Sequence, residues 1–240
     1  MAALPYVSVH LGRFDSPVTV APDGHGPNGG PAPPFLVGTD VAAGGAPPGV
    51  FAGRTWLGLG FHETEDASRG VVSAGPAGVP FLDGAAEVWA GACEPFSTRG
   101  TCNWLDRGAP GPVFAPADGG RHRGPFVVIT TVGWIIDEHV DMRRVDDFST
   151  GVDRVRAGID GTDGLHSSQV FVFADPTVDA LTVTFWRDDA AMRAFAYRPG
   201  EHKDQLDRFR ELETADRTSF TRLRVLDSWG TWHGSDPLGW

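Results

Sequence analysis

The sequence predicts an α+β fold built on the ferredoxin-like unit, an antiparallel sheet with helices on its outer face. The strongest indication is the hydrophobic periodicity of residues 124–240, which reads strand, helix, strand, strand, helix, strand. A second indication is a weaker echo of the same pattern in the first half. We therefore expect a degenerate ferredoxin-like repeat over 1–110 and a regular one over 124–240, with the boundary in the Gly/Pro/Asp-rich stretch 106–123.

Short elements are predicted for the first half. Apolar and polar side chains alternate over 4–14, 54–63 and 86–96, which is typical of half-buried strands. A further short strand is expected over 35–39, and a short helix over 65–72.

A long segment of this half, 16–50, is rich in Gly, Pro and Ala. Such a composition cannot bury enough apolar surface to form a core of its own. We expect a loop that wraps the domain, either as a functional lid or as a variable insertion.

The second half is more regular. A β-rich run with two apolar faces predicts a central strand over 126–135, and apolar residues at helical spacing predict a helix over 142–159. Two alternating runs around Asp175-Pro176 predict a hairpin. The elements after the first helix are strands over 165–173 and 178–186, helices over 189–197 (N-capped by Asp188) and 201–213, and a strand over 220–229.

Composition excludes several classes of partner. The formal net charge of −11 argues against a nucleic acid or an anionic membrane surface, because both require clustered positive charge. The sequence has neither a basic segment followed by an apolar run nor an apolar stretch of spanning length, so we expect a cytoplasmic protein without a membrane span. Cys93 and Cys102 are then expected to be free thiols, since their spacing matches no zinc site.

One titratable residue lies at the border of an apolar helix face. His202, Leu206, Phe209 and Leu212 follow one another at i, i+4, i+7 and i+10, so they form a stripe that faces inward. Two interpretations remain open from the residues alone. His202 is either a core or capping histidine bonded to the backbone, or a ligand of a cofactor that lies under the helix.

A resemblance favours the second interpretation. In Val183–Lys203, a strand ends in Trp186, an acidic N-cap follows, and the run Ala-Phe-Ala-Tyr precedes a His after a small loop. This stretch resembles the spheroidene monooxygenase (acyclic carotenoid ketolase) family, as does the tail Ser228–Leu238. The resemblance covers 124–238. It implies tandem ferredoxin-like repeats that form a dimeric α+β barrel, similar to heme-degrading monooxygenases, chlorite dismutases and aldoxime dehydratases.

The resemblance also implies heme b as the cofactor, with His202 as the axial ligand of its iron. Aromatic and apolar side chains would pack the porphyrin, and arginines would pair with its propionates. Polar residues on neighbouring strands are candidates for distal hydrogen bonding. The packing candidates are Phe195, Trp186, Leu206, Phe171 and Trp134, the propionate candidates Arg193 and Arg198, and the catalytic candidates His166, Ser167 and Thr130.

The expected function is a heme-dependent oxidoreductase of monooxygenase type that acts on an apolar or specialised-metabolite small molecule. The Gly/Pro-rich insertion departs from the family, so carotenoid need not be the substrate. Three alternatives remain: a heme-barrel dehydratase or N-oxygen-processing enzyme in natural-product biosynthesis, a cofactor-free barrel monooxygenase or cyclase, and a non-catalytic module that binds heme or another ligand. A tandem barrel can be complete in one chain, but the free sheet faces of this fold often pair again, so a homodimer is also considered.

Overall fold

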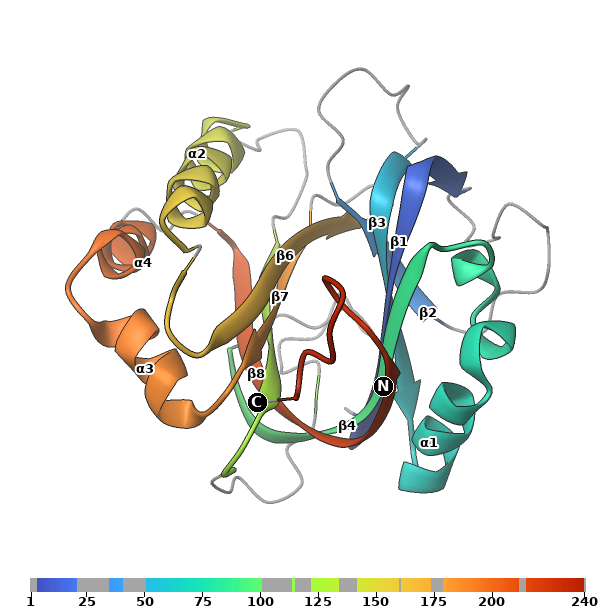
Figure 1. The fold of residues 1–240 in the computed structure, drawn as a ribbon. Coiled ribbons are helices and arrows are strands. Elements are labelled where there is room, and N and C mark those ends of the chain that lie inside the picture. Colours follow the sequence, from blue (N-terminus) through green and yellow to red (C-terminus); the bar gives the residue numbers. More distant parts are fainter. Residues whose placement is uncertain are drawn as a thin grey trace.

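The computed structural model describes residues 4–20, 35–40, 51–100, 114, 122–133, 142–159, 161–173, 179–211 and 215–239. The strands of these segments form one closed antiparallel barrel, and the helices lie outside it (Figure 1). The predicted α+β barrel is therefore confirmed.

Each half of the chain contributes four strands to this barrel. The elements of the first half are β1 (Tyr6–Val20), β2 (Phe35–Thr39), β3 (Phe51–His62), α1 (Glu65–Ser73), the 3-10 helices η1 (Gly75–Gly78) and η2 (Pro80–Leu82), and β4 (Glu87–Gly100). Those of the second half are β5 (Phe126–Gly133), α2 (Met142–Ile159), β6 (Leu165–Phe173), β7 (Asp179–Trp186), α3 (Asp189–Tyr197), α4 (Glu201–Glu211) and β8 (Arg217–Gly230).

The strand order is the same in the two halves. In space the first half runs β4-β1-β3-β2 and the second runs β8-β5-β7-β6, so each has the fourth strand beside the first and the third beside the second. This is the order of a ferredoxin-like sheet. The two sheets join where β2 pairs with β6 and β4 pairs with β8. The predicted boundary at 106–123 lies mostly outside the described residues.

Side chains fill the interior of the barrel. Alternate residues of every long strand point inward, such as Val7 and Val9 of β1 and Val183 and Phe185 of β7, and these are fully buried. Phe114, in the expected linker, is also fully buried there. The segment after β8 turns back over one end of the barrel (Figure 1), and its Trp232 joins the same core.

Several strands are longer than the sequence predicts. The expected loop 16–50 is wrong at its N-terminal end, because Val18, Thr19 and Val20 extend β1 and pair with Gly53, Ala52 and Phe51 of β3. A partner strand thus keeps these residues extended although Pro17 and nearby glycines weaken the local strand pattern. The helix over 142–159 and the strand over 165–173 have the predicted bounds.

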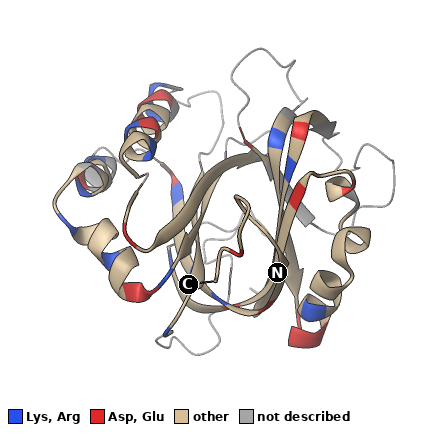
Figure 2. Cartoon of the chain, in the orientation of Figure 1, with Lys and Arg blue, Asp and Glu red and all other residues tan. Residues whose placement is uncertain are grey.

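The outer face carries most of the charged side chains. Figure 2 shows Lys, Arg, Asp and Glu spread along α1, α2, α3 and α4, with further charged residues on strands of the barrel wall such as β1 and β3. None of the helices within the described residues is both long and apolar enough to cross a bilayer.

Candidate functional site

The outer face of the second half is covered by α2, α3 and α4. α3 contacts β7 and α4, whereas α2 packs mainly against α4. Beneath them, Thr130 of β5 shares a face with Thr182 of β7, and both are only partly buried. Cofactors and ligands commonly occupy such spaces between packed elements.

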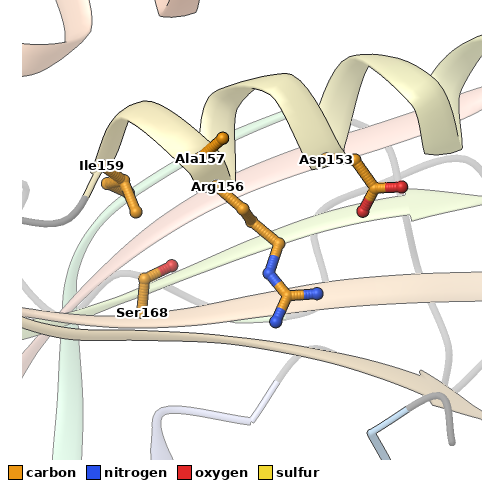
Figure 3. A pocket seen from close by; sticks show the side chains of 5 residues that line it. All are labelled: Asp153, Arg156, Ala157, Ile159 and Ser168. Carbon is orange, nitrogen blue, oxygen red and sulfur yellow. The ribbon is translucent and has the colours of Figure 1, made fainter.

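A cavity of about 310 Å³ lies between α2 and β6. Its walls are Asp153, Arg156, Ala157 and Ile159 from the last turns of α2 and Ser168 from β6. Figure 3 shows the guanidinium of Arg156 hanging from α2 towards the strands, with the Ser168 hydroxyl below the helix. Within the described residues, therefore, a polar cavity borders the helix-covered face of the sheet.

His202 joins this face through a stack of three rings. The imidazole of His202 and the ring of Phe195 have centroids 4.4 Å apart, and Phe195 lies 5.5 Å from Trp186. The indole Nε1 of Trp186 donates to Oγ1 of Thr184 at 2.8 Å. Thr184 pairs across the sheet with Ser168 of the cavity wall. The ring stack and the cavity are thus neighbours on one face of the sheet.

The surroundings of His202 favour a neutral imidazole. Burial lowers the pKa of His202, and a hydrogen bond to the backbone carbonyl of Ala196 opposes this only in part. Nδ1 of the same ring is buried and has no hydrogen-bond partner among the described atoms. A neutral ring that donates one N–H to a carbonyl keeps a lone pair on its other nitrogen. The arrangement leaves that nitrogen without a protein partner among the described atoms.

Local interactions hold α3, and with it Phe195, against the barrel. Asp188 N-caps α3 because its carboxylate accepts from the backbone N–H of Ala191 at 2.8 Å. Arg222 of β8 donates to Asp189 at 2.5 Å. Below the helix, Met192 packs in a cluster with Trp186 and Phe126. The predicted cap is confirmed, and it fixes where α3 begins.

The structure separates the predicted site residues into two groups. Trp186, Phe195 and Thr130 share the helix-covered face with His202. Phe171 and Ser167 point into the barrel interior, on the opposite face of the sheet. His166 lies at a register shift of β6, and its Nε2 is 3.1 Å from the carbonyl oxygen of Trp232 in the C-terminal segment.

The remaining predicted residues do not enter this arrangement. Arg193 forms an ion pair with Asp189 at 3.0 Å, and its side chain is 59% exposed. Arg198 is the exposed residue that ends α3. The side chain of Leu206 and all of Trp134 lie outside the described residues, as does Cys102. Cys93 is a buried free thiol whose pKa is raised by burial.

Sequence reasoning missed the residues of α2 that line the cavity. Arg156 directly follows Val155, which occupies the apolar stripe between Val152 and Ile159, so Arg156 borders that stripe. A charged residue beside an apolar stripe is a weak signal, because solvated helix surfaces carry many of them. Ser168 was visible as a polar residue on a mostly apolar strand, but nothing in the sequence connected it with α2.

Known proteins show a related sequence and a related fold. No family model matches the chain. Spheroidene monooxygenase of Rhodobacter capsulatus is 25% identical over 185 residues, which are 77% of this chain and 72% of that protein. The crystal structure of aldoxime dehydratase (OxdRE) in complex with butyraldoxime aligns with a TM-score of 0.55 at 11% identity, covering 100% of this chain and 86% of that one. The chain is therefore a homologue of spheroidene monooxygenase with the fold of the dimeric α+β barrels.

Proposed function

We propose that this protein is a heme-dependent oxidoreductase of monooxygenase type that acts on an apolar small molecule. His202 would be the axial ligand of heme b. The observation that carries the proposal is the state of this imidazole: the ring is half-buried, its pKa is lowered, and its buried Nδ1 has no hydrogen-bond partner among the described atoms. The relation to a monooxygenase sequence supports the class of reaction.

The residues around His202 fit a heme group. Iron requires a neutral imidazole, and ligand histidines usually donate their second nitrogen to a carbonyl or carboxylate. The carbonyl of Ala196 can serve as that acceptor. Phe195 and Trp186 offer apolar surface beside the ring.

When bound, the heme would supply the oxygen chemistry, and the chain would supply binding, orientation and exclusion of water. Asp188 and Arg222 hold α3 in place, so Phe195 keeps the imidazole plane oriented. Thr130 is the hydroxyl-bearing candidate on the same face as His202, where it could hold or orient a substrate proton. His166 and Ser167 are separated from this face by the sheet and could act only from the barrel interior.

Hemin titration followed by the Soret band tests the proposal. Wild-type protein is expected to bind hemin, and His202→Ala should bind it about tenfold more weakly or lose the axial-histidine spectrum. His122→Ala is a matched control, because His122 is also half-buried, bonds to a backbone carbonyl (Pro125, 3.0 Å) and contacts an aromatic ring. The control variant should bind hemin as the wild type does.

Two results would contradict the proposal. A colourless wild type that takes up no hemin would exclude heme chemistry, and turnover by such a protein would favour a cofactor-free monooxygenase or cyclase. Hemin binding that His202→Ala leaves unchanged would remove His202 as the ligand. Tight hemin binding without turnover of any oxidant would instead favour a heme-carrying module.

The fold match to aldoxime dehydratase favours a dehydratase as the second candidate. The two reactions differ in their electron balance. Monooxygenation consumes O₂ and two electrons from a reductant, whereas dehydration of an aldoxime releases water without net oxidation. The hemin-loaded protein should therefore be assayed with butyraldoxime in the absence of O₂ and, separately, with apolar substrates, O₂ and a reductant. Turnover only in the first assay would replace the monooxygenase proposal.

A further inference from the structure

The cavity between α2 and β6 combines one positively charged group with one hydroxyl. Arg156 and Ser168 come from elements on opposite sides of it, and Figure 3 shows both directed into the space between helix and strand. Within the described residues, neither side chain forms a hydrogen bond or an ion pair. The cavity thus holds hydrogen-bond donors that the described part of the protein leaves unused.

Other arginines of this layer are already engaged. Arg193 is paired with Asp189, Arg144 with Asp216 at 3.0 Å, and Arg187 with Asp163 at 2.9 Å. Arg156 differs from these in having no carboxylate partner among the described residues, although Asp153 lies one turn before it on α2 and also lines the cavity. A guanidinium that faces a cavity without a partner can bind an incoming anion through two parallel hydrogen bonds.

We propose that this cavity binds a carboxylate group, held by the guanidinium of Arg156 and the hydroxyl of Ser168. A singly charged anion suits the site better than a phosphate dianion, because Asp153 lies in the same cavity and the whole chain carries a net charge of −11. The identity of the molecule that carries this carboxylate rests on the proposed function. The group is either a propionate of the heme or the carboxylate of an organic acid substrate.

The position of the cavity connects it with His202. Ser168 pairs with Thr184, whose hydroxyl accepts from the indole of Trp186, the first ring of the stack that ends at His202. A ligand bound beside that stack can therefore extend a carboxylate arm into the cavity. If that arm is a heme propionate, Arg156 takes the role that the resemblance implies for Arg193 and Arg198.

Binding measurements on one matched pair of variants test the assignment. Arg156→Gln removes the charge that lines the cavity, whereas Arg154→Gln removes a charge from an equally exposed residue of the same helix that does not line it. Each protein is titrated with hemin, with hemin dimethyl ester and with octanoate. Thermal unfolding confirms that both variants are folded, which is expected because Arg156 has no bonds to other described residues to lose.

For a heme propionate, Arg156→Gln should weaken hemin binding about tenfold, as expected for loss of a charge-assisted pair. Arg154→Gln should leave it within about twofold. The dimethyl ester, which lacks both carboxylates, should bind wild type and Arg156→Gln equally. For a substrate carboxylate, octanoate binding should fall about tenfold in Arg156→Gln while hemin binding stays unchanged.

The proposal is overturned if Arg156→Gln binds both hemin and octanoate as tightly as the wild type does. Inorganic phosphate that binds more tightly than octanoate would also overturn it. A wild type that binds no hemin contradicts the proposed function alone, because the octanoate titration still decides whether Arg156 holds a carboxylate.

Discussion

The two halves of the barrel share a strand order but cover their outer faces differently. In the first half, Phe81 and Leu82 press directly onto the sheet, over positions where β1 and β3 have glycine. A Cβ atom at Gly58 would lie 2.3 Å from the ring of Phe81. In the second half, α2 and α4 pack on each other and leave a cavity above β6. Tight cover leaves no room for a ligand, so the candidate site belongs to the loosely covered half.

The largest expected effect on the free energy of unfolding comes from removing an aromatic ring from the outer face of the first half. Phe81→Ala should lower the free energy of unfolding by about 3–5 kcal/mol, because Phe81 is only 4% exposed and its removal opens a void above the sheet. Phe195→Ala removes the same ring from the loosely covered half, where the side chain is only partly buried, and should cost about 1 kcal/mol. Urea denaturation of both variants measures the difference. Equal losses would contradict the contrast between the two covers.

An intermediate effect is expected from pH, through a histidine beneath the tight cover. Burial lowers the pKa of His10 to about 3, with a contribution from His62. The pKa in the unfolded chain is higher, so acid protonates the unfolded state first, and stability falls as the pH drops below about 6.5. Between about pH 7.5 and about pH 5 the loss from His10 should be about 2 kcal/mol.

Denaturant unfolding at the two pH values measures this loss. The variant His10→Gln, which cannot titrate, should show a shallower pH dependence than the wild type over the same interval. If His10→Gln shows the same pH dependence as the wild type, His10 is protonated in the folded protein. The outer face of the first half would then be more hydrated than its packing suggests.

The smallest effects are expected at the helix N-termini of the two covers. The Asp188 carboxylate caps α3 at 2.8 Å, whereas the Thr64 hydroxyl caps α1 at 3.2 Å. Asp188→Ala should cost about 1–2 kcal/mol and Thr64→Ala about 0.5–1 kcal/mol, because the carboxylate also interacts with the positive end of its helix. Thermal unfolding of the two variants compares them. A larger loss for Thr64→Ala would mean that α1 depends more on its cap than on its packing.

The sequence predicts the second half of the fold more closely than the first, for a physical reason. The helix over 142–159 and the strand over 165–173 have unbroken periodicity, and their bounds are correct. The end of β1 is held extended by β3, a long-range partner that local composition does not reveal. The extension of β1 can be predicted only once its pairing with β3 is known.

The candidate site could be predicted only in part. The apolar spacing of 201–213 identifies His202, but Phe171, a predicted packing residue of the same porphyrin, lies on the other face of the sheet. Both faces of β6 mix polar and apolar residues, with Ser167 and Phe171 towards the barrel core and Ser168 and Val170 towards the helices, so alternation cannot tell the two faces apart. Arg156 remained unassigned because its role depends on the separation between α2 and the sheet.

Because one chain supplies both four-stranded sheets, the barrel has only approximate internal symmetry. In a barrel made from two identical subunits, every substitution appears twice, so a residue that fills one cavity also fills the symmetry-related cavity. Covalent linkage removes that constraint, so Phe81 can fill one outer face while the corresponding face of the other half stays open. The pseudo-equivalent halves are thus free to diverge, one with a filled outer face and the other with a cavity.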